Sequence, residues 1–360
     1  MNVRVPRYDH DRIRSPRPSR GRRLLRLLRT PLLVAIVLSL AALYLTQPIL
    51  GVVRDPASGG AAKRVDAGRL RHHVEELSQR FAPRDPGHPK NLDGAAEYIR
   101  ARFVEAGLAT SFQEFDVNGR TFRNVVATTG QAAAPAVERT DAPAAADLVV
   151  VGAHYDAVGP AIGADDNASG VAGLLELAPL LKDERGTARV ELVAWCLEEP
   201  PFFRTRFMGS RVHAESLRKS NARVRATICL EMIGCFSDAD GSQDYPLVGL
   251  GLLYPSRANF ITVVGCVGQA SLVRSVKRAM AQASDLPVWS INAPRALPGI
   301  DFSDHLNYWD AGYDAVMVSD TAFYRNANYH RATDTAESLD YPRMAEVVAG
   351  VRAAVAALAK

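Results

Sequence analysis

The sequence predicts an α/β protein with a mixed, mostly parallel central sheet, helices on both faces, and one transmembrane helix in front of it. Two observations support this class. Short apolar runs, typical of strands buried on both faces, alternate with longer segments in which apolar residues recur at helical spacing. In addition, residues 31–53 contain no charged side chain. At about 1.5 Å per residue, this segment is long enough to cross a hydrocarbon layer of roughly 30 Å.

The strands and helices of the folded part follow one another along the chain. The expected strands are residues 111–117, 122–128, 147–155, 189–197, 225–234, 259–266, 287–291 and 313–320. The expected helices are residues 69–81, 91–108, 168–183, 208–220, 270–284 and 342–360. In an open sheet of this class, functional sites form beyond the carboxyl ends of the strands.

Positive charge is concentrated at the N-terminus. Residues 1–30 hold ten arginines against Asp9 and Asp11, a local charge of +8, whereas the whole chain carries +4. The remainder is therefore slightly acidic and lacks a basic stripe, which excludes a nucleic-acid-binding face. Because residues 1–30 have few apolar groups, we expect them to form an unfolded tail.

This charge asymmetry orients the predicted span, because positive residues stay on the cytoplasmic side. We expect a single-pass protein of the cell inner membrane, with a cytoplasmic tail (1–30), a transmembrane helix (31–53), a linker (54–65) and a folded domain (66–360). The domain would be periplasmic or extracellular. A cleaved signal peptide is the alternative, but the apolar segment is long and no Ala-x-Ala cleavage site follows it.

Acidic and histidine residues occur where strands are expected to end. In the pair His154 and Asp156, an imidazole can bind a metal while the carboxylate holds its other nitrogen, although a surface His beside a turn Asp is an ordinary alternative. Asp165 and Asp166 stand at a loop-to-helix junction, where helix capping explains one carboxylate but not two. A carboxylate at this position is suited to bridging two cations.

Three further positions strengthen this interpretation. The adjacent Glu198 and Glu199 follow an expected strand, and a cation beside one of them would relieve their repulsion while the other accepts a proton. Glu231 is the one charge in an otherwise apolar run and is costly to bury without a partner. His330 lies in a loop near the C-terminus, and Asp334 follows within about one turn. Because the cysteines form no Cys-x-x-Cys pair, a metal site here must be built from His and carboxylate.

The motifs His-x-Asp, GADDNASG, Glu-Glu, EMIG and YHxxxDT, in this order, resemble those of the co-catalytic dizinc aminopeptidases, which include bacterial leucine aminopeptidases. The resemblance covers the chain from about Arg69 to the C-terminus. Glutamate carboxypeptidase II and the glutaminyl cyclases are similar as well, so likeness of fold does not fix the reaction.

The resemblance implies two bound zinc ions. His154 and Glu231 would bind one ion, Glu199 and His330 the other, and Asp166 would bridge both. Many members of the family carry Asp where this chain has Glu231, whose extra methylene changes the reach of the carboxylate. It can still bind zinc at about 2.0–2.2 Å if the strand lies slightly farther back.

The resemblance also implies roles for three residues that are not ligands. Glu198 would be the general base, and Asp156 would orient His154. Tyr329 would hydrogen-bond the oxyanion of the reaction, although packing within its loop is an equal alternative.

Two further groups of residues near the motifs are less specific. Asp301, Asp304 and His305 are excluded from the ligand set, because a His beside a turn Asp is usually a satisfied structural pair. Five aromatic side chains flank the motifs and either line an apolar substrate pocket or pack in the core: Trp195, Phe202, Phe203, Phe323 and Tyr324.

We therefore expect a membrane-anchored dizinc exopeptidase, a metallo-aminopeptidase whose partners are a peptide substrate and the membrane. A zinc-activated water would attack the peptide bond, and Glu198 would transfer the proton. One alternative is a glutaminyl cyclase-like acyltransferase, which needs one zinc. The other is a non-catalytic ectodomain, in which ligand positions should have been lost.

The predicted topology is testable in intact cells. If the tail is cytoplasmic and the domain lies outside, protease added to cells with a permeable outer barrier and an intact inner membrane should degrade the folded domain. Degradation that requires disruption of the inner membrane would reverse the orientation.

Overall fold

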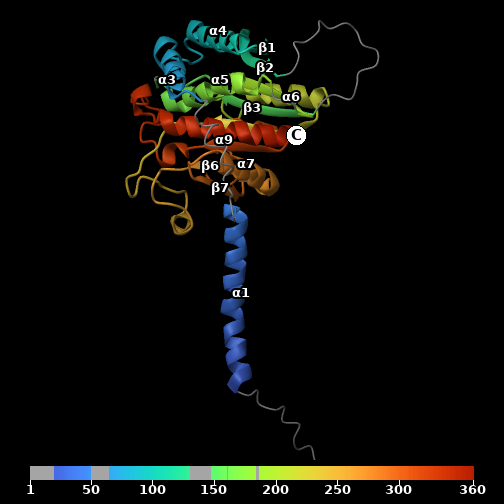
Figure 1. Cartoon of the computed structure of the whole chain (residues 1–360), viewed down its shortest axis with the longest axis vertical. Coiled ribbons are helices and arrows are strands. Elements are labelled where there is room, and N and C mark those ends of the chain that lie inside the picture. The colour runs from blue at the N-terminus through green and yellow to red at the C-terminus, as the bar shows by residue number, and fades with distance from the viewer. Residues whose placement is uncertain (1–19, 50–64, 130–146, 160, 184–185) are drawn as a thin grey trace, which may run out of the picture. The chain divides into compact units, whose positions relative to one another are not determined.

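The computed structural model describes residues 20–49, 65–129, 147–159, 161–183 and 186–360 (Figure 1). The first 19 residues of the predicted tail and nearly all of the predicted linker lie outside these ranges. The chain divides into two compact units, Met1–Leu43 and Tyr44–Lys360, and each is described by itself.

Helix α1 (Arg20–Thr46) carries the apolar segment. Its window Arg29–Thr46 is long and apolar enough to cross a membrane by length and composition, and none of that window is buried inside the protein. The helix ends at Thr46, because Gln47 has a positive φ of 42° and Pro48 follows. The predicted span 31–53 overlaps α1 up to this point. The boundaries of tail, span and linker stay predictions.

The C-terminal end of α1 belongs to the second unit, where two basic side chains of α7 (Ala270–Ala283) hold it. Lys277 Nζ donates to the carbonyl oxygen of Thr46 at 2.9 Å, and Arg274 donates through Nε and Nη2 to Gln47 Oε1 at 2.9 and 2.6 Å. Positive groups at a helix C-terminus satisfy its last carbonyls and oppose its dipole. These bonds fix the place where the chain enters the second unit.

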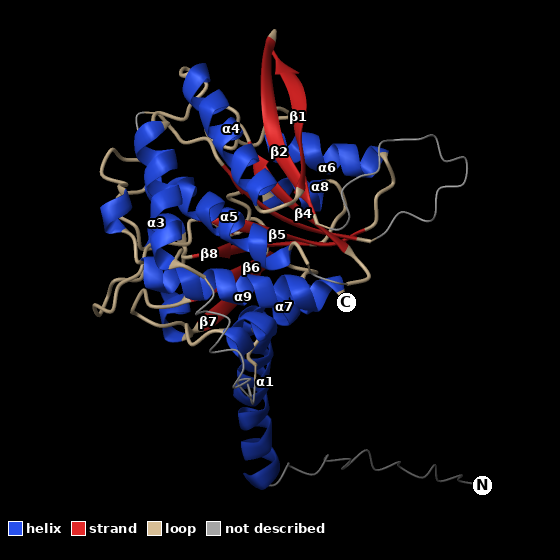
Figure 2. Ribbon diagram, turned by 45° about the horizontal axis from the view of Figure 1, so that its top comes forward, coloured by secondary structure: helices blue, strands red, loops and turns tan. Residues whose placement is uncertain are grey.

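The second unit is built on an eight-stranded sheet with strand order β1-β2-β4-β3-β5-β8-β6-β7 (Figure 2). The neighbours from β4 to β8 are parallel, as are β6 and β7, whereas β6 is antiparallel to β8. The hairpin of β1 and β2 adds to β4 in antiparallel fashion. The strands are β1 (Ala109–Val117), β2 (Arg120–Thr128), β3 (Leu148–His154), β4 (Arg189–Trp195), β5 (Val224–Glu231), β6 (Ile261–Cys266), β7 (Val288–Ala293) and β8 (Ala315–Ser319).

Helices cover both faces of the sheet (Figure 2). The larger core lies under α3, α5, α7 and α9, and a smaller core around Trp195 and Tyr308 lies under α6 and α8. Helix α4 packs on the β1–β2 hairpin. The bounds are α3 (Ala67–Glu75), α4 (Pro89–Glu105), α5 (Gly170–Leu181), α6 (Gly209–Lys219), α8 (His305–Asp310) and α9 (Tyr341–Ala359).

The predicted fold class is confirmed. Each predicted strand run contains a strand and each predicted helical segment contains a helix. Strand β3 is buried at every position, which explains its continuous apolar sequence. The sequence did not predict α8, because six residues are too few to establish a helical repeat.

Candidate metal centre

The acidic and histidine residues of the motifs meet beyond the carboxyl ends of adjacent parallel strands. His154 is the last residue of β3, and Glu231 is the last residue of β5. Glu198 and Glu199 follow β4, which ends at Trp195. Because β4, β3 and β5 are parallel neighbours, these three segments leave the sheet side by side.

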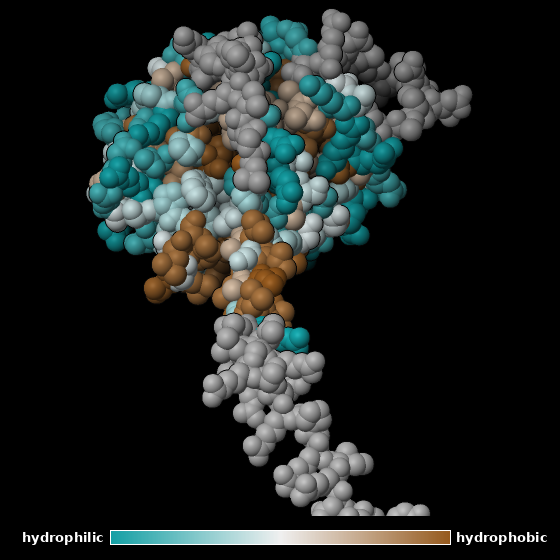
Figure 3. Space-filling model, turned by 60° about the horizontal axis from the view of Figure 1, so that its bottom comes forward, coloured by the Kyte–Doolittle hydropathy of each residue, from teal (hydrophilic) through white to brown (hydrophobic). Residues whose placement is uncertain are grey.

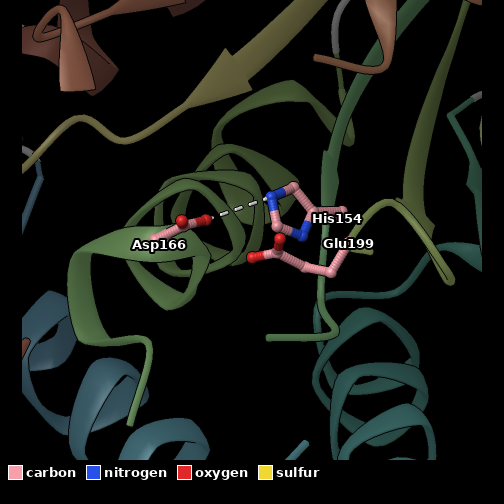
Figure 4. Close-up of side chains that lie close together, drawn as sticks. All are labelled: His154, Asp166 and Glu199. Atoms are coloured by element: carbon pink, nitrogen blue, oxygen red, sulfur yellow. Dashed lines mark ion pairs between the residues drawn. The ribbon is translucent and has the colours of Figure 1, made fainter. Parts of the chain in front are cut away.

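Asp166 and His330 reach the same place from two loops. Asp166 lies between β3 and α5 in the short turn Ala164–Ser169, and His330 lies in the loop before α9 with a φ of 58°. Asp166 Oδ1 is 3.4 Å from His154 Nε2, and Asp166 Oδ2 is 3.2 Å from His330 Nε2. Figure 4 shows the Asp166 carboxylate directed at the His154 ring, with Glu199 beside it.

Each carboxylate oxygen of Asp166 faces its own histidine-carboxylate pair, whose atoms could bind a metal. Each pair together with Asp166 is called a donor set below. On one side, His154 Nε2 is 3.5 Å from Glu231 Oε2. On the other side, His330 Nε2 is 3.3 Å from Glu199 Oε2. The structure therefore brings together all five residues that the sequence predicted as metal ligands, in two sets that share Asp166.

The spacing of these atoms fits a divalent metal. Two ligand atoms that lie about 2.0–2.2 Å from a tetrahedral zinc are about 3.3–3.6 Å apart, and the four separations within the two sets are 3.2 to 3.5 Å. Ligand atoms of His154, Asp166 and Glu199 lie within 4.8 Å of one another. Among the described residues, the buried atoms His154 Nε2 and Glu199 Oε1 have no hydrogen-bond partner. A buried polar atom without a partner lowers the stability of the fold unless a bound ligand contacts it.

The charges of the site also favour cations. Burial raises the pKa of Glu199 to about 7, and burial raises the pKa of Glu231 and of Glu198 above their usual values. Burial lowers the pKa of His154, but the carboxylates around it, Glu231 foremost, raise this pKa well above its ordinary value. The cluster thus retains protons that a bound metal would displace.

Asp156 fixes the segment that carries the two glutamates. Its Oδ1 accepts the backbone N–H of Glu198 and its Oδ2 accepts the backbone N–H of Glu199, both at 3.1 Å. His154 Nδ1 is 3.1 Å from the carbonyl oxygen of Asp156 and 3.5 Å from its Oδ1. Asp156 therefore contacts both the imidazole and the glutamate pair.

The two adjacent glutamates take different positions. Glu199 belongs to the His330 set, whereas Glu198 Oε2 lies 3.9 Å from His154 Nε2, the longest carboxylate separation from that nitrogen. Both side chains are buried. Glu198 thus lies at the edge of the cluster, next to the donor sets but outside them.

Tyr329 stacks on His330, with ring centroids 3.8 Å apart and the planes inclined by 17°. It also contacts Phe323, at 5.4 Å between centroids. Burial raises the pKa of Tyr329, so its hydroxyl keeps its proton at neutral pH. A protonated phenol here can donate a hydrogen bond to a substrate oxygen.

An apolar cavity of about 90 Å³ adjoins the donor sets. Glu231 and Tyr329 line it on the side of the metal centre, and Phe302, Phe323 and Tyr324 line it among other aromatic and aliphatic side chains. Two of the five aromatic residues weighed from the sequence therefore line this cavity.

The other three aromatic residues lie elsewhere. Trp195 is buried in the smaller core, where it packs against Tyr308, and Phe202 packs against the larger core. Phe203 contacts Phe302 at 6.3 Å between ring centroids and lines a second pocket, together with Arg204 and Asp301.

Two residues that support the centre were not predicted from the sequence to do so. Asp334 accepts the backbone N–H of Asp165 at 3.0 Å and that of Asp166 at 3.1 Å. Ser303 Oγ donates to Glu231 Oε2 at 2.6 Å. The YHxxxDT motif contained Asp334, but nothing in its spacing indicated that its partners are backbone groups.

The residues around Ser303 were excluded as metal ligands, and none of them belongs to the two donor sets. Asp301 forms an ion pair with Arg204 at 2.6 Å, and His305 Nε2 bonds to the carbonyl oxygen of Ile300 at 2.7 Å. Asp304 is fully buried, and burial raises its pKa to about 7.

A fully buried arginine, Arg84, ties together the loops behind the centre. It donates to the carbonyl oxygens of Leu77, Tyr155 and Gly163 at 2.7 to 2.8 Å. Gly163 has a φ of 67°, and a Cβ atom there would lie 2.4 Å from the carbonyl oxygen of Asp166. Burial lowers the pKa of Arg84 to about 10, so it remains charged at neutral pH.

Comparison with known proteins identifies relatives of this chain. The family model "Peptidase family M28" matches residues 124–355. An uncharacterized protein of Escherichia coli strain K12, YfbL, is 46% identical over 291 residues, which cover 79% of this chain and 85% of that protein.

Solved structures share the fold at low sequence identity. An aminopeptidase from Aneurinibacillus sp. strain AM-1 is 18% identical with a TM-score of 0.60, over 83% of this chain and 95% of that chain. A zinc aminopeptidase from Bacillus subtilis is 16% identical with a TM-score of 0.62, over 81% and 94%. A glutaminyl cyclase from Bacteroides thetaiotaomicron is 16% identical with a TM-score of 0.58, over 81% and 97%.

The family model spans more than half of the chain, and the Escherichia coli relative matches most of both sequences. This chain therefore belongs to peptidase family M28.

Proposed function

We propose that this protein is a membrane-anchored aminopeptidase that binds two zinc ions. The observation that supports the proposal most directly is the position of Asp166, whose two carboxylate oxygens face two separate histidine-carboxylate pairs. A single-metal site would not need a second imidazole at 3.2 Å from the far oxygen of the same carboxylate.

The proposed ligands are His154 and Glu231 for one zinc, Glu199 and His330 for the other, and Asp166 for both. Bound zinc would polarise the carbonyl of the scissile bond and lower the pKa of a water. The position of Ser303, which donates to Glu231 Oε2, helps to hold the longer glutamate side chain.

Glu198 is the proposed general base. Its carboxylate lies next to the donor sets without belonging to either, so it is free to accept the proton of the attacking water and return it to the leaving amine. Asp156 orients this base by binding the backbone N–H groups of Glu198 and Glu199. Tyr329 is the proposed donor to the oxyanion that develops on the substrate carbonyl, and its stacking on the proposed ligand His330 supports this role.

The cavity beside Glu231 and Tyr329 supports a preference for substrates with an apolar N-terminal side chain. Its lining includes Tyr254, Phe302 and Phe323. Burial of such a side chain stabilises binding through the hydrophobic effect.

The substrate range and the zinc content together test the proposal. Purified full-length protein should hold about two zinc per chain, release leucine from a free-amine leucyl chromogenic substrate, and leave its N-acetylated analogue intact. Cyclisation of an N-terminal glutaminyl peptide with one zinc per chain would favour the acyltransferase. Protein that holds no zinc and hydrolyses nothing would be a binding ectodomain.

The bridging role of Asp166 is tested by Asp166→Asn. Loss of the negative charge that both ions share should remove more zinc than Glu199→Gln or Glu231→Gln, each of which weakens one site. Zinc content per chain, measured by atomic emission on purified protein, checks this. Asp301→Asn is the matched control, because Asp301 pairs with Arg204 outside the donor sets. Full zinc occupancy in Asp166→Asn would remove Asp166 from the site.

Substitutions of the two adjacent glutamates should impair the enzyme in different ways. Glu198→Gln keeps the size of the side chain but abolishes its basicity, so kcat should fall by roughly 10²- to 10⁴-fold with zinc content and KM little changed. Glu199→Gln replaces a charged ligand with a neutral one, so zinc should be lost first and activity should partly return when zinc is added in excess.

Steady-state kinetics together with zinc content separate these two patterns. Equal loss of zinc in both variants would point to general damage of the segment held by Asp156. Loss of zinc in Glu198→Gln alone would reverse the two assignments.

A further inference from the structure

One exposed loop of the second unit is markedly apolar. Four of its side chains are more than a third exposed, and Val248 is 99% and Leu252 89% exposed. No charged residue occurs between positions 246 and 253. Figure 3 shows hydrophobic side chains gathered on this face against a mostly polar surface. Residues 246–253 are called the apolar loop below. Its exposed members are Leu247, Val248, Leu252 and Leu253.

The apolar loop is held from within. Its residues 248–252 form a 3₁₀ turn, and the backbone N–H of Leu253 donates to the carbonyl oxygen of Leu250 at 2.9 Å. Leu250 is buried and lines the cavity beside the metal centre together with Tyr245 and Tyr254. The loop thus turns one side toward the cavity and presents its other apolar side chains to the outside.

Hydrogen bonds place this loop next to the end of α1. Tyr254 Oη donates to the carbonyl oxygen of Ser290 at 2.8 Å, and Ser290 Oγ donates to the carbonyl oxygen of Thr46 at 2.7 Å. The phenol of Tyr44 accepts the backbone N–H of Gly268 at 3.3 Å, beside Val267, which is 59% exposed.

The length of the apolar helix brings the hydrocarbon layer to this face. Arg29 is the last charged residue before the end of α1 at Thr46, and the residues between it and that end, 30–46, are uncharged. At about 1.5 Å per residue this segment spans about 26 Å, slightly less than the roughly 30 Å of a bilayer core. A bilayer crossed by α1 would therefore extend at least as far as Tyr44 to Thr46. These residues are hydrogen-bonded to the face that carries the apolar loop.

We propose that the apolar loop, together with Val267, inserts into the same lipid bilayer that α1 crosses. This second membrane contact rests on the proposed anchoring by α1. Exposed apolar patches rimmed by polar surface mark interaction sites, and here a bilayer surface is the neighbour that the anchor itself supplies. Two contacts, one through α1 and one through the loop, fix the orientation of the second unit on the membrane.

The contact also locates the substrate cavity. Since the loop that enters the lipid also lines the cavity beside Glu231, that cavity lies close to the bilayer surface. Peptides that partition into the membrane interface would therefore reach the metal centre along a short path.

Depth-dependent quenching of a fluorescent label tests the insertion. Single cysteines are placed in the full chain at Val248, at Leu38 in α1, and at Val104 in α4, an exposed valine away from this face that serves as the matched control. Each variant is labelled with NBD, reconstituted into phosphatidylcholine vesicles, and quenched with lipids that carry a nitroxide on the acyl chain. Unsubstituted protein gives the background from the native cysteines, of which Cys196, Cys229 and Cys266 are buried.

We expect the label at Val248 to emit at shorter wavelength than the label at Val104, and to be quenched severalfold more by nitroxide near the headgroups. The label at Leu38 should be quenched best by nitroxide deeper in the acyl chains. Quenching at Leu38 together with water-like, unquenched emission at Val248 overturns the loop contact and leaves the anchor intact. Quenching at neither position overturns both.

A second copy of the chain is the competing occupant of the apolar loop. It would shift the Val248 emission without nitroxide quenching, and the shift would disappear as the protein is diluted in lipid. That outcome also overturns the lipid contact. Because Val248 is almost fully exposed, its replacement by cysteine should leave zinc content and peptidase activity unchanged.

Discussion

Repulsion among buried carboxylates is the constraint on which the rest of this structure depends. Asp166, Glu198, Glu199 and Glu231 are all less than a tenth exposed and converge on two imidazoles. Ionised groups in such surroundings are costly unless paired, and breaking a buried pairing typically costs about 3–5 kcal/mol. A dication in each of the two proposed donor sets would relieve this cost, and the separations of 3.2 to 3.5 Å between their atoms fit such an ion.

The surrounding structure holds these groups close together through the backbone. Asp156 binds the N–H groups of the glutamate pair, and Asp334 binds those of Asp165 and Asp166. Arg84 binds carbonyl oxygens of the same loops and adds a positive charge behind the carboxylates. These hydrogen bonds do not involve the side-chain atoms proposed to bind metal. They can therefore hold the loops in place whether or not a metal is bound.

The same unit joins the metal centre to an apolar surface. The segment that follows β5 supplies cavity residues such as Tyr254 on its inner side and the exposed Val248 on its outer side. Lys277 and Arg274 hold the end of α1 near this segment. With the proposed anchor and loop contact, such a peptidase would work on substrates next to a membrane, and the anchor would restrict the orientations in which they approach.

The sequence by itself determined the fold class and the chemical types of the site. Continuous apolar runs such as β3 predict buried parallel strands, and a carboxylate such as Glu231 in such a run is costly to bury without a partner. The order of the motifs then led to the five predicted ligand positions through their resemblance to a known family.

Only the tertiary structure decided how these residues pair and what supports them. Local sequence does not encode the strand order β4-β3-β5, which brings His154 beside Glu231 and the glutamate pair. Asp334 and Ser303 act on groups that are far away in sequence, so no short pattern revealed them. The same holds for the apolar loop, whose residues predict neither strand nor helix. The proposed membrane contact of this loop depends on hydrogen bonds that place it beside the end of α1. Such neighbours are distant along the chain and meet only when the sheet is assembled.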